Sequence, residues 1–264
     1  MQLDCNPAKT DVAKLLDVWP PLPISLKSDF ISDGDGIINK LQHRDRIVRI
    51  ELNNLTAIQL ERCATLMQGP FPFLRSLMLY LRRKANDLPV LPNTFLAVSA
   101  PCLHFLSLKS IQFPTLLRLL LSARDLVSLY LDDVTSTRYI SPDTIVTSLS
   151  MLTRLRCLQI HFLSQGSFSN PRNPSHPLQA LLNHAVPPSL SVLMFWGVSK
   201  YSEDLMSWIN AALLFLMFLS FYINPSSTSY NYPCACITVE YSSHRLRWSM
   251  YTLMITSFTS AFYH

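Results

Sequence analysis

This sequence contains few of the residues on which nucleotide and nucleic-acid chemistry usually depends. It has only 5 glycines in 264 residues, and none lies in a Walker or dinucleotide-binding pattern. The charged fraction is 15% against 49% hydrophobic residues, which excludes a disordered chain. The net charge of +5 is spread along the chain. Without a clustered face of Lys and Arg, we expect no nucleic-acid binding.

The cysteines form no recognisable motif either. Their positions are Cys5, Cys63, Cys102, Cys157, Cys234 and Cys236, with no Cys-x-x-Cys pair and no histidine at zinc-ligand spacing. Cys234 and Cys236 supply at most two ligands for a soft metal, so we expect no metal site and no cofactor. The first residues lack the basic and then apolar regions of a secretory signal. Reduced cysteines in a cytoplasmic or nuclear protein are therefore expected.

The sequence does contain a repeated apolar pattern. The spacing apolar-x-x-apolar-x-apolar begins at Ile47, Leu74, Leu103, Leu126, Leu155, Leu190 and Leu213. The starts are separated by roughly the length of one strand-turn-helix unit. This pattern predicts an α/β fold, an irregular leucine-rich-repeat solenoid of about seven strand-helix units. An ordinary leucine-rich α/β domain with accidental spacing is the alternative.

Several segments between the predicted strands carry helix signals. Thr56 and Gln59 form a capping box, and Leu55 and Leu60 are placed as a hydrophobic staple. Ser141 followed by Pro142 predicts a second helix start. Residues 177–185 form a third candidate helix.

The repeat departs from the commonest leucine-rich consensus at its ninth position, which usually holds Asn or Cys. Here that position holds Leu55, Arg82, Ile111, Val134, Leu163, Val198 and Phe221. No Asn ladder can form, so we expect irregular turns and unequal repeats.

The pattern divides the chain into three parts. Residues 1–40 are a lead-in segment, 41–224 the repeat region, and 225–264 an atypical tail without a period. We expect the tail to be disordered or to be a gene-model artefact. Residues 205–223 hold few polar side chains (Ser207, Asn210 and Ser220). A membrane-anchored protein held by an apolar helix at 205–223 is therefore the alternative to a terminal repeat strand.

Six short segments stand out beyond the repeat itself. They are LDVWPPLPI at 16–24, HRDRI at 43–47, PVLPNTFL at 89–96, SAPCL at 99–103, LLSARDLV at 120–127 and YISP at 139–142. Over about residues 15–222 the chain resembles fungal, basidiomycete-type F-box and leucine-rich-repeat proteins. The resemblance implies a surface that recognises a protein client for a ubiquitin ligase. The residues ahead of Leu16 are too few for an F-box, so binding to a cullin-ligase adaptor is expected only if an F-box is supplied elsewhere.

Residues between the apolar positions of each strand should share one sheet face. Open faces of solenoids bind partners, and aromatic residues, Met and Arg are enriched at interfaces. The predicted partner-binding residues are Arg49, Glu51, Met78, Tyr80, Phe105, Lys109, Tyr130, Asp132, His161, Met194 and Trp196, with Asn53 and Gln159 on the same face. Among these, Tyr80, Tyr130 and Trp196 are the expected anchors. We predict no catalytic residue and no enzyme activity.

Overall fold

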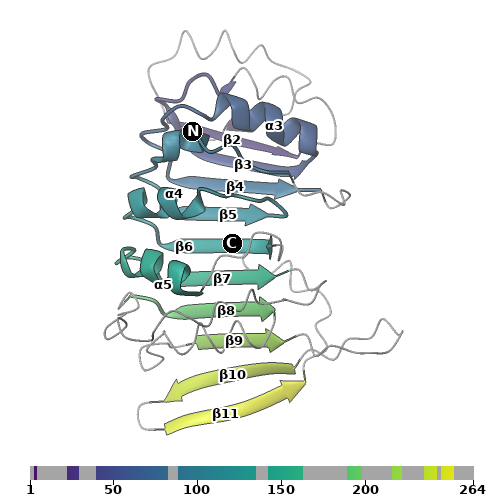
Figure 1. Ribbon diagram of the computed structural model, residues 1–264, viewed down its shortest axis with the longest axis vertical. Helices are drawn as coiled ribbons and strands as arrows, with labels where there is room; N and C mark the ends of the chain where they lie inside the picture. Colours follow the sequence, from purple (N-terminus) through teal and green to yellow (C-terminus); the bar gives the residue numbers. More distant parts are fainter. Residues whose placement is uncertain are drawn as a thin grey trace, which may run out of the picture.

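The fold is a single row of strands with helices packed along one face (Figure 1). The computed structural model describes residues 3–4, 23–29, 40–82, 89–134, 142–162, 189–197, 216–221, 235–242 and 245–252. The strands are β1 (Leu3–Asp4), β2 (Ile24–Asp29), β3 (Ile47–Leu55), β4 (Ser76–Leu81), β5 (Phe105–Lys109), β6 (Ser128–Val134), β7 (Cys157–Phe162), β8 (Val192–Gly197), β9 (Leu216–Phe221), β10 (Ala235–Ser242) and β11 (Arg245–Thr252). The described helices are α3 (Ala57–Leu66), the 3-10 helix η1 (Phe95–Val98), α4 (Leu116–Ser122) and α5 (Pro142–Ser150).

The strands follow one another in the sheet in the same order as in the sequence. Every pair from β1–β2 to β8–β9 is parallel, and β9–β10 and β10–β11 are antiparallel. Parallel neighbours need a crossover connection, and α3, α4 and α5 lie within three of these connections. Because β1 and β11 each pair on one side only, the sheet is open. The predicted α/β fold with strands alternating with helices is confirmed.

The seven predicted strand segments correspond to β3 through β9. In β6 the burial alternates at every residue, as expected for a strand with one face against a core. In β4 the apolar residues Leu77, Leu79 and Leu81 are buried and Tyr80 is partly exposed. The apolar pattern therefore predicted the strands and, in β4 and β6, the residues that face the core.

The sheet extends past both ends of the predicted repeat region. On one side, β2 lies within residues 1–40 and pairs in parallel with β3, with Ile24 and Leu26 buried. On the other side, β10 and β11 form an antiparallel hairpin within residues 225–264, where the sequence pattern indicated no element. The boundaries at 41 and 224 thus do not coincide with the edges of the sheet.

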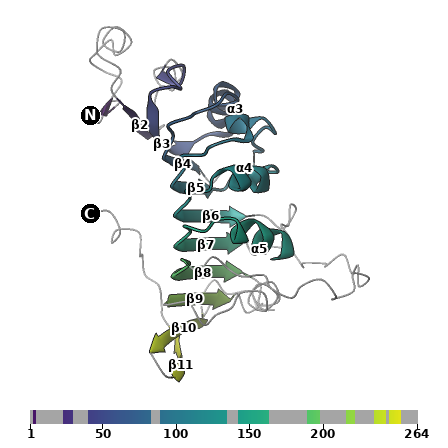
Figure 2. The same cartoon turned by 90° about the vertical axis from the view of Figure 1, so that its left-hand side faces the viewer.

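The described helices lie on one face of the sheet (Figure 2). Helix α3 begins at the predicted capping box: the Thr56 hydroxyl accepts from the Gln59 N–H and the Gln59 side chain accepts from the Thr56 N–H. Leu55 and Leu60, the predicted staple, are both buried. Helix α5 begins at the predicted Pro142, and α4 was not predicted. The candidate helix at 177–185 lies outside the described residues.

Three strands have a left-handed residue at or next to their C-terminal end, at position eight of the apolar pattern. These residues are Asn54 (φ 56°), Ser110 (φ 57°) and Asp133 (φ 58°). The register of the sheet shifts near two of them, after Leu52 and after Leu131. The residue that follows the left-handed one is buried at position nine in two of the three patterns, at Leu55 and Ile111. These two ninth-position residues therefore belong to the core, and the expected irregularity of the turns stays a prediction.

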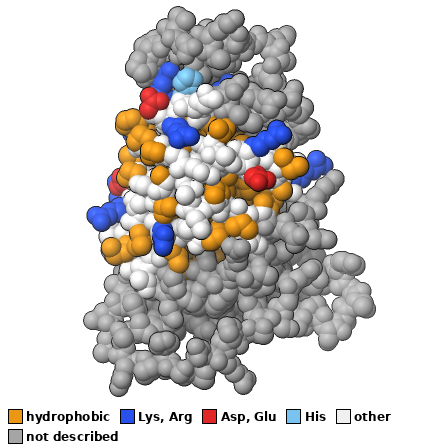
Figure 3. Space-filling view, turned by 45° about the horizontal axis from the view of Figure 1, so that its top comes forward, with side chains coloured by type: hydrophobic (Ala, Val, Ile, Leu, Met, Phe, Trp, Pro, Cys, Tyr) orange, Lys and Arg blue, Asp and Glu red, His pale blue; other side chains and the backbone are white. Residues whose placement is uncertain are grey.

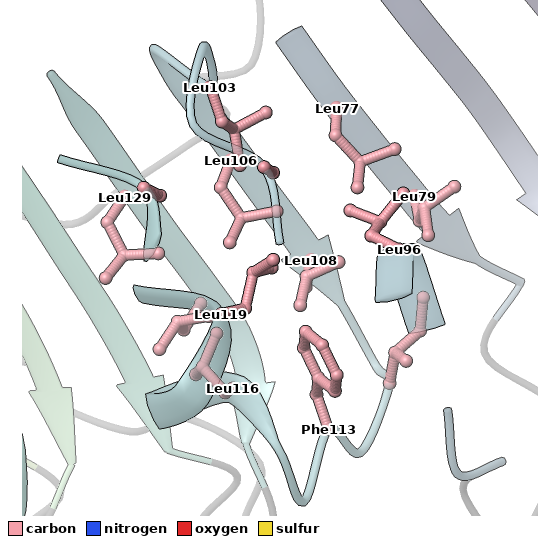
Figure 4. Close-up of a cluster of buried hydrophobic side chains, with 14 of the residues drawn as sticks. Leu77, Leu79, Leu96, Leu103, Leu106, Leu108, Phe113, Leu116, Leu119 and Leu129 are labelled. Atoms are coloured by element: carbon pink, nitrogen blue, oxygen red, sulfur yellow. The ribbon is translucent and has the colours of Figure 1, made fainter. Parts of the chain in front are cut away.

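The core lies between the sheet and the helices (Figure 4). Leu77, Leu106 and Leu129 are register partners on neighbouring strands, and their side chains point toward the helical layer. Phe95 and Phe113 pack edge-to-face with ring centroids 5.5 Å apart. The exposed large apolar residues are Ile58, Phe73, Val90, Leu121 and Met151. In the view of Figure 3, apolar side chains are interspersed with polar surface and single charged groups.

The apolar stretch at 205–223 contains a strand. Residues 216–221 form β9, which pairs with β8 and β10, so a continuous membrane helix over 205–223 is not the structure of this segment. The other residues of the stretch lie outside the described part. Among the described helices, none has the length and apolar character needed to cross a bilayer.

Candidate functional site

The sheet face opposite the described helices carries three rows of side chains from successive strands. We call these three rows the open face. The first row is Ser25, Arg49, Ser76, Phe105, Ser128, Cys157 and Val192. The middle row is Lys27, Glu51, Met78, Ser107, Tyr130, Gln159 and Met194. The last row is Asp29, Asn53, Tyr80, Lys109, Asp132, His161 and Trp196.

All of the predicted partner-binding residues lie in these rows. The sequential parallel order brings them together because each strand repeats the alternation of the one before it. Arg49 is exposed, and Tyr80, Tyr130 and Trp196 are partly exposed. The structure therefore places the predicted anchors on one continuous face.

Two of the predicted contact residues are not accessible. Glu51 is 5% exposed and Met78 is 6% exposed. Both occupy the middle row, where neighbouring strands are only about 4.8 Å apart and longer side chains lean across from the adjacent rows. Glu51 and Met78 are thus covered by their neighbours on the face, whereas the other predicted residues carry more exposed surface.

Two tyrosines lean diagonally across the open face. The Ser107 hydroxyl donates to the Tyr80 hydroxyl over 3.1 Å, although Tyr80 is in register with Lys109. The Cys157 thiol likewise donates to the Tyr130 hydroxyl over 3.4 Å, although Tyr130 is in register with Gln159. These bonds fix the rings over the middle and first rows.

The tyrosine rings form part of an aromatic surface. Phe105 and Tyr130 stack with centroids 5.2 Å apart and an interplanar angle of 30°. His161 and Trp196 meet edge-on at 6.1 Å. Burial raises the pKa of Tyr130 above its ordinary value, and the bond with Cys157 adds to this effect. Tyr130 is therefore a neutral, oriented ring at physiological pH.

A buried carboxylate lies between two basic side chains at the β2–β3 end. Glu51 accepts from Lys27 Nζ at 3.1 Å and from Arg49 Nη2 at 3.0 Å. The two basic side chains remain 47% and 46% exposed, whereas the Glu51 side chain is 6% exposed. The β2–β3 end of the open face therefore presents the positive charge of Lys27 and Arg49 to solvent.

A second polar cluster lies on β5, β6 and β7. Lys109 Nζ contacts Asp132 Oδ2 at 2.8 Å, and His161 Nδ1 contacts Asp132 Oδ1. Burial alone would raise the pKa of Asp132, but the hydrogen bonds from His161 and Lys109 outweigh it and lower that pKa to about 2. Asp133 is buried beside this pair and accepts a bond from the Ser110 hydroxyl at 2.7 Å.

Sequence reasoning missed some residues of the face. Lys27 was missed because the repeat was traced only from Ile47, although Ile24 and Leu26 alternate with polar residues in the same manner. Asp133 was missed because it follows Asp132 directly, and only a left-handed residue can turn it toward the same cluster. No local pattern could have indicated that contact.

No protein-family model, no curated protein and no solved structure matches this chain. The functional argument therefore depends on the geometry of the open face.

Proposed function

We propose that this chain is a non-catalytic protein-binding scaffold, an irregular leucine-rich-repeat solenoid whose open face receives a protein client. The supporting observation is the alignment of three polar and aromatic rows on a sheet face opposite the described helices. Each strand contributes one side chain to each row, so the surface is extended and varied in chemistry.

The chemistry of the open face supports a protein ligand. The partly exposed Tyr80, Tyr130 and Trp196 supply apolar area, and hydrogen bonds or ring contacts already orient them. Pre-oriented aromatic side chains lose little conformational entropy on binding, which is why such residues often dominate interface energetics. The exposed ends of Lys27, Arg49 and Lys109 add charged contacts around these rings.

The resemblance to F-box and leucine-rich-repeat proteins suggests that the client is a ubiquitin-ligase substrate. In that role, the open face of this chain is the surface that recognises the client. Cys63, Cys102 and Cys157 are free thiols, which fits the proposed cytoplasmic or nuclear location.

Site-specific photo-crosslinking tests the proposed binding face. A photoreactive phenylalanine analogue is placed at Tyr80 or Trp196 on the open face and, as a control, at Ile58 or Leu121, which are exposed on the helices. We expect one protein to be crosslinked from both open-face positions and from neither helical position. Equal crosslinking from the two faces, or crosslinking from the helices alone, would contradict the proposal.

A matched pair of variants tests the energetic role of the anchors. The triple substitution Tyr80→Ala, Tyr130→Ala, Trp196→Ala should abolish capture of the crosslinked protein. The triple substitution Ile58→Ala, Leu121→Ala, Met151→Ala removes exposed apolar side chains from the helical side, and this variant should still capture the protein. Circular dichroism must show both variants folded. Loss of capture in the helical-side variant alone would move the binding site to that side.

A further inference from the structure

We propose that the client presents an extended segment with one acidic and one apolar side chain to the open face. The acidic side chain binds between Lys27 and Arg49, and the apolar side chain, about three residues along the segment, packs on Phe105. This inference rests on the proposed function, because it names the client chemistry that the open face would recognise.

One covered carboxylate holds two basic groups side by side. Lys27 Nζ lies 3.1 Å from Glu51 Oε1, and Arg49 Nη2 lies 3.0 Å from Glu51 Oε2. The Glu51 side chain is 6% exposed, whereas the side chains of Lys27 and Arg49 are 47% and 46% exposed. An ammonium group has three N–H donors and a guanidinium group has five, so donors remain for a client carboxylate.

The charges at this end of the open face are unbalanced. Lys27 and Arg49 carry two positive charges against the single negative charge of Glu51, so one further carboxylate would make the group neutral. Arg75 is exposed, and its backbone N–H bonds to β3 directly before Arg49, which adds a third basic residue. Asp29 is exposed in the last row, two residues from Lys27. Because the basic groups still outnumber the acidic ones, charge complementarity favours an acidic client segment.

The acidic and apolar contacts lie along one row. Arg49, Ser76 and Phe105 are successive members of the first row. Because Ser76 is small, a client segment can cross from Arg49 to Phe105 without meeting a long side chain in that row. Neighbouring strands are about 4.8 Å apart, so the two contacts are about 10 Å apart, roughly the length of three extended residues. Stacking on Tyr130 holds the Phe105 ring in place for an apolar side chain.

The Lys109 end of the open face is less suited to a client carboxylate. Lys109 Nζ contacts Asp132 Oδ2 at 2.8 Å, and the Asp132 side chain is 24% exposed. A client carboxylate at Lys109 would therefore meet an accessible acidic group, whereas the acidic group between Lys27 and Arg49 is covered. This difference fixes the direction in which the segment crosses the strands.

Peptide selection tests the inference without a known client. We would select peptides from a phage-displayed random library on the immobilised full chain. The enriched peptides should hold Asp or Glu about three residues from an aromatic or aliphatic residue. They should not bind the triple variant Tyr80→Ala, Tyr130→Ala, Trp196→Ala, because that variant lacks the anchors of the open face.

A double-mutant cycle places the acidic side chain. Fluorescence anisotropy would measure the affinity of one enriched peptide and of its acid-to-amide variant. The amide should bind the wild-type chain about fivefold more weakly, as expected for one exposed ion pair. This difference should nearly vanish in Lys27→Gln and persist in Lys109→Gln, a matched control at the other end of the open face. Arg49→Gln replaces Lys27→Gln if circular dichroism shows the latter unfolded.

The outcomes separate this inference from the proposed function. Peptides that need the three anchors but show no acidic preference would overturn the inference and leave the open face as the binding surface. An amide penalty that persists in Lys27→Gln would do the same. Peptides that bind the triple variant as well as the wild-type chain would contradict the open face itself. If no peptide is enriched, an extended segment is not the ligand of this face, and the inference fails.

Discussion

At the scale of single residues, position eight of the apolar pattern is left-handed near the ends of three strands. Asn54, Ser110 and Asp133 adopt positive φ values, and Ser110 bonds to Asp133 across the neighbouring strands. Asn and Asp tolerate the left-handed region better than most residues, because their short polar side chains can bond locally. An apolar side chain follows each of these residues, namely Leu55, Ile111 and Val134.

Substitution of Asn54 tests this assignment directly. Asn54→Ala should lower the free energy of unfolding by about 1 kcal/mol, since Ala is strained at a φ of 56°. Asn54→Gly removes the same exposed side chain without that strain and should be neutral or stabilising. Urea denaturation of both variants measures the difference, and equal losses would show that the side chain matters rather than the backbone.

The buried thiol of Cys63 makes stability depend on alkaline pH. Burial raises the pKa of Cys63 from 9.0 to about 11. Because the folded-state pKa is the higher one, the stabilisation is fully present below pH 9 and is lost as the pH rises toward 11. Between pH 9 and about pH 10, this group should lower the free energy of unfolding by about 1 kcal/mol.

Comparison with Cys63→Ala isolates the thiol from other groups that titrate in the same range. The variant should show a shallower loss of stability over this interval in urea denaturation. An unchanged pH slope would mean that Cys63 is accessible to solvent in the folded protein.

At the scale of elements, strands were predicted better than helices. Each strand repeats a short apolar alternation, and its existence follows from the local pattern. Helix α3 has a capping box and was predicted, whereas α4 has no side-chain cap bond and was missed. The short helix α4 is held by burial of Leu116, Leu119 and Leu120 against the sheet. Its formation therefore depends on tertiary packing.

The capping box gives a prediction for α3. Thr56→Ala should lower the free energy of unfolding by about 1 kcal/mol, because it removes the hydroxyl that accepts from the Gln59 N–H. Thr65 in the same helix is also exposed, but its hydroxyl donates only to the Glu61 carbonyl. Thr65→Ala should change stability by less than about 0.5 kcal/mol. Thermal unfolding measures the stability of both variants. Similar losses of stability would show that the cap hydrogen bond of Thr56 contributes no more than the Thr65 hydroxyl.

At the scale of the whole molecule, the sheet is a one-dimensional stack in which each strand pairs only with its sequence neighbours. In such arrays, stability is close to a sum of unit terms and nearest-neighbour interfaces. A destabilising substitution in one strand should therefore lower the stability of that strand and its neighbours, and leave distant strands unchanged.

Leu106 on β5 tests that locality. It is fully buried and in register with Leu77 and Leu129, so Leu106→Ala should destabilise its surroundings by about 3 kcal/mol. Under native conditions, we expect faster amide hydrogen exchange in β4, β5 and β6 and unchanged exchange in β8. Uniform acceleration from β3 to β8 would show an all-or-none domain instead of a stack of units.

The sequence by itself determined where seven strands lie and which residues alternate within their regular parts, because the period of two is a property of the local backbone. It determined the capping box of α3 for the same reason. Only the tertiary structure decided that Glu51 and Met78 are covered, that Lys27 joins the open face, and that Asp133 turns toward Asp132 and His161. These outcomes depend on register shifts, diagonal side-chain contacts and residues about 25 to 30 positions apart, which a pattern within one strand does not encode.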